Sequence, residues 1–118
     1  MASLMPIDEE IKRIMRFHVG REHAIKKQDL IRELVRRGHE VNERGLRNLV
    51  RDLRRNGHLI CSAAAEDGGY YIANSRAEVD DFFRMELDAK IQDMSQTRSA
   101  MKRTADAQFG EGTQMGLF

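Results

Sequence analysis

The chain has 118 residues, of which 41% are hydrophobic and 33% are charged, and its formal net charge is +1. This length allows one small domain with an extension, and no apolar run is long enough to span a membrane. The first residues lack the basic flank and the long apolar stretch of a secretory signal, and the single Cys61 cannot form an internal disulfide. We therefore expect a cytoplasmic protein, with a mostly aliphatic core because Trp is absent.

Charge is distributed unevenly along the chain. Residues 21–57 carry eleven basic and six acidic side chains, a net charge of +5. Residues 58–118 carry six basic and ten acidic side chains, a net charge of −4. Contacts with phosphates are expected in the basic segment, whereas the acidic C-terminal half is not expected to lie on nucleic acid.

Two helices are predicted before the centre of the chain. Apolar side chains recur at helical spacing from Ile7 to His18, and we expect this first helix to end at Gly20. A strand of one or two residues is expected at Ile25. The second helix follows and ends near Gly38, because glycine suits the turn beyond a helix end. The residues expected on its apolar face are Leu30, Ile31, Leu34 and Val35.

Residues 42–57 have the clearest helical pattern, with Asn42 as a suitable N-cap and Gly57 just beyond the last turn. The apolar residues that predict a buried face are Leu46, Leu49, Val50 and Leu53. The arginines that predict a second, cationic face are Arg44, Arg47, Arg51, Arg54 and Arg55. An arginine-faced helix after another helix and a tight turn is typical of a helix-turn-helix. The alternative is a solvated surface helix held by salt bridges.

The pattern changes after Gly57. Residues 59–62 and 70–73 are short apolar runs that predict two paired strands, and Glu-Asp-Gly-Gly at residues 66–69 is typical of the turn between them. The predicted fold class is therefore mainly α with a small β-hairpin. Helices followed by such a hairpin are the arrangement of a winged helix-turn-helix domain, which we place at residues 1–75. The acidic turn argues against contact between the hairpin tip and a DNA backbone.

Residues 7–75 resemble the winged helix-turn-helix superfamily, most closely small winged helix proteins of bacteria and their phages. The likeness is carried by LVRDLRRNGHLI at residues 49–60 and GGYYIA at residues 68–73. It implies binding to double-stranded DNA, although some winged helices are protein-interaction modules. It further implies that arginines of residues 42–57 enter or straddle the major groove, that an amide there reads an adenine edge, and that the start of the second helix meets phosphates. The expected DNA-binding residues are Lys26, Lys27, Gln28, Arg44, Arg47, Asn48, Arg51 and Arg55.

Gly45 is unusual inside a helix, where glycine costs about 1 kcal/mol relative to alanine. Two explanations stay open. The backbone at Gly45 approaches DNA or the second helix closely, or glycine is simply tolerated near a helix start.

Residues 76–107 are predicted to form a long amphipathic helix that opens with a capping box at Ser75 and Glu78. Its apolar stripe has coiled-coil spacing from Leu87 onward, with an interruption at Arg98. The first turns are expected to pack on the domain. The remainder either pairs with a second copy, which would give a homodimer, or is a frayed solvated helix beyond Ser95. The stripe consists of Val79, Phe83, Leu87, Ile91, Met94, Met101 and Ala105.

Residues 108–118 are predicted to be a flexible tail with a short motif at its end. The sequence Gln114-Met115-Gly116-Leu117-Phe118 resembles the pentapeptide by which bacterial replication and repair proteins bind the sliding clamp. The resemblance implies that Leu117 and Phe118 fill an apolar pocket of the clamp, that Met115 fills a shallower one, and that the Gln114 amide hydrogen-bonds nearby. Gly116 departs from the usual serine or aspartate. The alternative is that the terminal apolar pair folds back on the domain.

The sequence offers little for catalysis, and we expect neither an enzyme nor a cofactor. The four histidines are scattered, and His58 with Cys61 lacks the second pair that a zinc site needs. Our leading hypothesis is therefore a nucleoid-associated accessory protein of bacterial or phage DNA replication, with partners double-stranded DNA and the sliding clamp. The alternatives are a homodimeric winged-helix transcriptional regulator and an adaptor that does not bind DNA.

Overall fold

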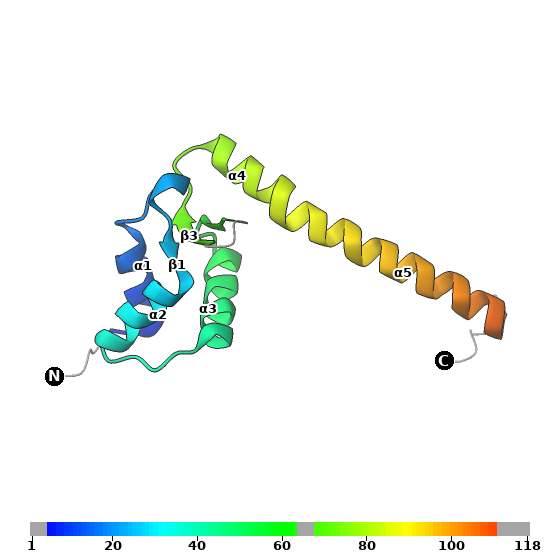
Figure 1. Cartoon of the computed structure of the whole chain (residues 1–118), viewed down its shortest axis with the longest axis horizontal. Helices are drawn as coiled ribbons and strands as arrows, with labels where there is room; N and C mark the ends of the chain where they lie inside the picture. Colours follow the sequence, from blue (N-terminus) through cyan, green and yellow to red (C-terminus); the bar gives the residue numbers. More distant parts are fainter. Residues whose placement is uncertain (1–4, 64–67, 111–118) are drawn as a thin grey trace. The chain divides into compact units, whose positions relative to one another are not determined.

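The computed structural model describes residues 5–63 and 68–110. It is mainly helical, with a small three-stranded antiparallel sheet and a long C-terminal helix (Figure 1). The chain divides into two compact units, one up to Phe83 and one from Arg84 onward. A mainly α fold with a small sheet is thereby confirmed, and the short strand expected at Ile25 joins the hairpin as a third strand.

Three α-helices contribute buried residues to the core of the first unit: α1 (Ile7–Met15), α2 (Lys27–Arg36) and α3 (Glu43–Arg55). The prediction that the first helix continues to Gly20 is wrong. The chain leaves α1 after Met15 because the next residues pair with a strand, where the Ile72 N–H donates to the His18 carbonyl at 2.8 Å. Gly20 (φ 92°) donates back to the Ile72 carbonyl at 2.8 Å. A 3₁₀ turn, η1 (Arg21–His23), then leads into the sheet.

The sheet has the strand order β1-β3-β2, with β1 (Ile25–Lys26), β2 (Ile60–Ser62) and β3 (Gly69–Ile72). Ile25 pairs with Tyr70 across the β1–β3 ladder, and Cys61 pairs with Tyr71 across the β2–β3 ladder. Gly69 is required at the start of β3, because a Cβ there would lie 2.0 Å from the Ile25 carbonyl oxygen. The sheet thus holds the segment before α2 against the segment after α3.

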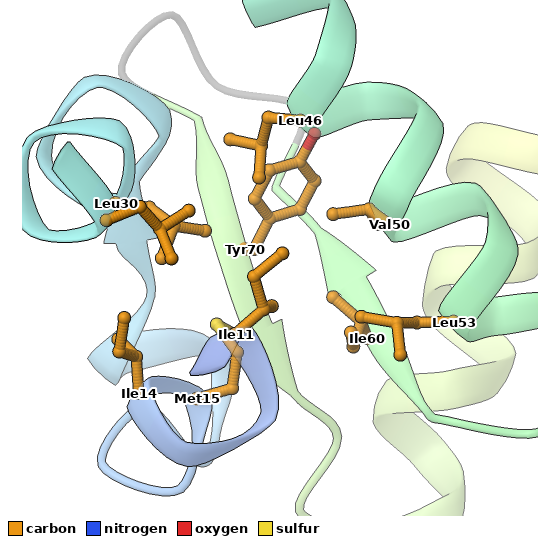
Figure 2. Packing of buried hydrophobic residues seen from close by; sticks show 10 residues of the cluster. Ile11, Ile14, Met15, Leu30, Leu46, Val50, Leu53, Ile60 and Tyr70 are labelled. Atoms are coloured by element: carbon orange, nitrogen blue, oxygen red, sulfur yellow. The ribbon is translucent and has the colours of Figure 1, made fainter. Parts of the chain in front are cut away.

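The core forms where the three helices meet the sheet. Leu30 and Leu34 of α2 and Leu46 of α3 are fully buried, and Tyr70 of β3 is 3% exposed. Figure 2 shows side chains from α1, α2 and α3 converging on the Tyr70 ring. The apolar residues whose spacing predicted each helix are therefore mostly the residues by which that helix packs on the other elements. Val35, predicted on the buried face of α2, is 54% exposed because it lies at the edge of the stripe that Leu30 and Leu34 define.

A buried carboxylate links α1 to the end of α2. Glu10 is only 4% exposed, and its side chain accepts a hydrogen bond from Arg37 Nη1 at 2.8 Å. His39 Nε2 lies 3.4 Å from the other carboxylate oxygen. Arg37 also donates from Nε to Glu33 at 2.8 Å, so one guanidinium ties both helices together. Gly38 (φ 95°) makes the turn that brings these groups together, as its position after α2 predicted.

The C-terminal helical region contains α4 (Arg76–Phe82), a π-helical turn η2 (Phe83–Leu87) and α5 (Asp88–Phe109). The Ser75 hydroxyl accepts from the Glu78 N–H at 3.3 Å, as expected of the capping residue. The Glu78 carboxylate reaches the Asn74 N–H at 2.7 Å and the Arg21 N–H at 3.0 Å, which fixes the start of α4 on η1. The long helix predicted at 76–107 is therefore helical throughout, with a π turn that apolar periodicity did not indicate.

Candidate nucleic-acid interface

The face of α3 that points away from the core is cationic. Leu46, Val50 and Leu53 bury one side of the helix, and Asn42 caps its start by accepting from the Gly45 N–H at 2.8 Å. Because side chains four and seven residues apart share a helix face, the residues between the buried positions gather on the opposite side. The exposed residues there are Arg44, Arg47, Asn48, Arg51 and Arg55.

Arg54 does not belong to this face, and the prediction that placed it there is wrong. Its Nε donates to the Ile60 carbonyl of β2 at 2.6 Å, and its guanidinium carbon lies 4.8 Å from the centre of the Phe82 ring. The Tyr70 ring lies on the same guanidinium at 6.0 Å. Arg54 therefore joins α3 to the sheet and to α4 by a hydrogen bond and cation–π contacts. It is not available to a ligand of α3.

The arginines of the exposed face differ in their local partners. Arg47 pairs with Glu43 at 3.3 Å, and Arg51 lies 3.4 Å from Asp52. All four of these side chains are at least half exposed, and such surface pairs contribute only about 0–1 kcal/mol. Within residues 5–63 and 68–110, Arg44 and Arg55 make no ion pair. The face can therefore exchange its weak internal pairs for phosphates at small cost.

The start of α2 lies beside the start of α3. Gln28 Nε2 donates to Glu43 Oε2 at 3.3 Å, while the other oxygen of the same carboxylate holds Arg47. Lys27 Nζ lies 5.6 Å from the centre of the Tyr70 ring, and Lys26 is exposed. The structure thus connects Gln28 with Arg47 through Glu43. Glu43 was not among the predicted site residues. Its spacing of four residues from Arg47 indicates their ion pair, but spacing alone does not reveal the hydrogen bond from Gln28 of α2.

Gly45 faces its own helix cap. A Cβ at this position would lie 3.3 Å from Asn42 Oδ1 and 3.4 Å from Val41 Cγ2. These are the nearest atoms, so the contact is with the turn before α3 and not with α2. A close approach of Gly45 to the second helix is therefore not found, whereas close approach to DNA and simple tolerance near the helix start both stay open.

The described residues also include a thiol and two phenol hydroxyls that are buried in the sheet. Cys61 is 2% exposed in β2, where burial raises the pKa of its thiol. Burial likewise raises the pKa of the Tyr70 and Tyr71 hydroxyls. Residues 5–63 and 68–110 contain no cluster of three or more His, Cys, Asp or Glu able to hold a metal ion. No helix in these ranges is long and apolar enough to cross a bilayer.

Two of the predicted features lie wholly or partly outside the described residues: Glu66 and Asp67 of the hairpin turn, and the clamp-binding pentapeptide with Gln114, Met115, Leu117 and Phe118. Comparison with protein-family models, with curated proteins and with solved structures gives no match to this chain.

Proposed function

We propose that the first unit is a winged helix domain that binds duplex DNA through the exposed face of α3. The observation that carries the proposal is the separation of charge from core on this helix, with four exposed arginines opposite Leu46, Val50 and Leu53. The order of elements and the strand order β1-β3-β2 support the winged helix assignment. The net charge of +5 on residues 21–57 supports a polyanionic ligand.

In this proposal the arginines position the helix and Asn48 reads sequence. Arg44 and Arg55 contact phosphates directly, because neither has an ion pair to give up within the described residues. Asn48 lies among them on the exposed face, where its amide can bond to the N6 and N7 positions of adenine. Gln28 and Lys26 extend the surface along the start of α2. Glu43 keeps Arg47 and Gln28 in place before DNA binds.

The test is a titration of labelled duplex DNA at several salt concentrations. If Arg44 and Arg55 each neutralise a phosphate, the Arg44→Ala, Arg55→Ala variant reduces the salt slope of log K by about 2. The matched control is Arg13→Ala, Arg16→Ala at the end of α1, which removes two exposed arginines from another surface and leaves the slope unchanged. Equal slopes for both variants would remove α3 as the binding helix.

We further propose that the pentapeptide at residues 114–118 docks on the sliding clamp and places the domain at sites of replication. Support comes from the sequence Gln-Met-Gly-Leu-Phe itself, which holds two large apolar side chains three residues after a glutamine. Burial of two such side chains in a partner contributes roughly 3–6 kcal/mol before ordering costs. Tethering to DNA raises the effective concentration of the peptide at a clamp on the same duplex, so two weak contacts reinforce each other.

This second part is tested with a labelled peptide, residues 107–118, titrated with a purified bacterial clamp. We expect saturable binding at micromolar clamp concentration, and its loss in the peptide with Leu117→Ala and Phe118→Ala. A result in which both peptides bind equally, or neither binds, would leave a dimeric transcriptional regulator as the better proposal. That alternative is favoured by the exposed apolar stripe of α5, and it predicts a palindromic DNA site.

A further inference from the structure

Residues 5–63 and 68–110 leave the apolar stripe of α5 exposed. None of the 22 residues of α5 is buried, and Ile91, Met94 and Met101 are 65%, 71% and 68% exposed. A shallow apolar surface follows the stripe, lined by Met94, Thr97, Arg98, Met101, Lys102 and Ala105. Because a helix gains most of its stability from packing of its apolar face, we expect a partner to cover this stripe.

The spacing of the stripe identifies another helix of the same kind as the partner. From Leu87 the apolar positions alternate in steps of four and three residues, the repeat of a two-stranded coiled coil. The repeat includes Arg98. In a parallel pair with matching register each stripe residue meets its own copy, so the two Arg98 guanidinium groups would lie together in the seam. Two unpaired like charges there would oppose the pairing.

We propose that α5 pairs with α5 of a second copy in the antiparallel direction, in the register that sets Ile91 opposite Met101. The same register sets Leu87 opposite Ala105 and Met94 opposite Arg98 of the other copy. Each Arg98 then lies beside a flexible methionine, and its guanidinium extends to solvent.

Sliding one helix by seven residues would instead set Leu87 opposite Arg98 and Met101 opposite Arg84. The chosen register is therefore the one that pairs most apolar positions with each other.

The charges beside the stripe favour this same register. On one flank Asp88 of each copy faces Lys102 of the other, which gives two interhelical ion pairs of opposite sign. Lys102 is 61% exposed and now pairs with Asp106 at 2.9 Å on its own helix, so it can reach a partner. On the other flank Lys90 faces Thr104, so no like charges meet there. In a parallel pair neither Asp88 nor Lys102 faces an opposite charge. The proposal does not depend on DNA or clamp binding.

The first test measures self-association of the full chain by sedimentation equilibrium up to about 300 µM. We expect dimers that Met94→Asp weakens at least about tenfold. The control Gln96→Asp places the same charge on an exposed position outside the stripe and leaves association unchanged. Circular dichroism checks that both variants keep the fold of the first unit. A chain that stays monomeric over this range would overturn the proposal.

The second test determines direction with charge variants. Asp88→Lys alone sets two ammonium groups against each other on the flank, and Lys102→Asp alone sets two carboxylates against each other. Each variant by itself should therefore associate about tenfold more weakly than the parent. An equimolar mixture of the two variants should recover association, because both flanking pairs are then of opposite sign. Recovery is specific to the antiparallel register, and a mixture that remains as weak as its components contradicts it.

Cysteine cross-linking gives an independent readout of the register. Under mild oxidation, Ile91→Cys mixed with Met101→Cys should form the disulfide between the two variants, identified by mass spectrometry of its peptides. Met101→Cys alone should not cross-link, because the two copies of that residue lie at opposite ends of the pair. Efficient cross-linking of Met101→Cys alone would show a parallel pair and overturn the proposal.

Discussion

In α3, Leu46, Val50 and Leu53 are at most 4% exposed, whereas in α5 Ile91, Met94 and Met101 are 65–71% exposed. Both helices carry apolar residues at helical spacing, and both have charged residues between them. The difference is what the rest of the chain provides: a sheet and two helices cover the stripe of α3, and nothing among the described residues covers that of α5. An apolar stripe in a sequence therefore predicts a helix and a contact, without saying whether the contact lies within the chain.

The largest expected effect on stability comes from replacing one apolar side chain of the stripe with alanine, and it differs between α3 and α5. Leu46→Ala leaves a cavity in a fully buried site and should lower the free energy of unfolding by about 2–5 kcal/mol. Ile91→Ala removes an exposed side chain and should change it by less than about 0.5 kcal/mol in dilute protein. Urea unfolding followed by tyrosine fluorescence measures the first unit alone, because both tyrosines of the chain lie in β3. Similar losses for the two variants would mean that α5 packs on the first unit.

The next expected effect is a dependence of the stability of the first unit on pH. Hydrogen bonds from Arg36 and Arg37 lower the pKa of the Glu33 carboxylate from 4.5 to about 2. Since the pKa is lower in the folded state, the carboxylate stabilises the fold above pH 4.5, and this contribution is lost as the pH falls from 4.5 through 2. Glu33→Gln should therefore unfold at lower urea than the parent at neutral pH, and the difference should narrow across that interval.

The matched change on α5 is Asp106→Asn. It removes the carboxylate that pairs with Lys102 at the helix surface, a contact worth a few tenths of a kcal/mol. The urea midpoint reported by the tyrosines should stay that of the parent from neutral pH to pH 2. A gap between parent and Glu33→Gln that stays constant as the pH falls would contradict the lowered pKa of Glu33.

A smaller effect distinguishes a helix that is capped by a side chain from one that is not. Asn42 accepts the Gly45 N–H at 2.8 Å, and Asn42→Ala should cost about 1 kcal/mol of stability in the first unit. α5 has no side-chain cap, and alanine has the higher helix propensity, so Ser95→Ala in its exposed middle should leave stability unchanged or raise it slightly. The tyrosine urea midpoint gives the value for Asn42→Ala, and the helical circular dichroism signal during urea unfolding gives that for Ser95→Ala. An Asn42→Ala variant as stable as the parent would show that water replaces the cap.

The sequence predicted local features well because their causes lie within a few residues. The cap at Asn42 and the left-handed Gly38 and Gly57 are set by neighbours along the chain, and all three are present. The apolar spacing of α3 likewise predicted Leu46, Val50 and Leu53 as core residues. These are properties of a segment, so the segment is enough to predict them.

Features that depend on distant residues were missed. Arg54 lies at the border between the buried and exposed sides of α3, and its contacts with the Ile60 carbonyl and the Phe82 ring draw it inward. Glu10 is a buried link between α1 and the end of α2 because Arg37 and His39, distant in the sequence, contact its carboxylate. The exposed part of the candidate site needed no distant partner. Its arginines were therefore placed correctly on the surface, while what they bind stays a prediction.

The smallest expected effect concerns a glycine-to-alanine substitution in the first turn of α3, compared with the same substitution on a solvated helix such as α5. On a solvated helix, replacing glycine with alanine gains about 1 kcal/mol. At Gly45 the added Cβ would lie 3.3 Å from Asn42 Oδ1 and 3.4 Å from Val41 Cγ2, closer than ordinary contact, so the cap must shift by a few tenths of an ångström. We therefore expect Gly45→Ala to change stability by less than about 0.5 kcal/mol, since the gain in propensity offsets the strain in the cap. Gly69→Ala is the contrasting variant, because its Cβ would meet the Ile25 carbonyl at 2.0 Å and disrupt the β1–β3 pairing. A gain of the full 1 kcal/mol for Gly45→Ala would show that the cap yields freely, and the start of α3 would then resemble α5 in being determined by propensity alone.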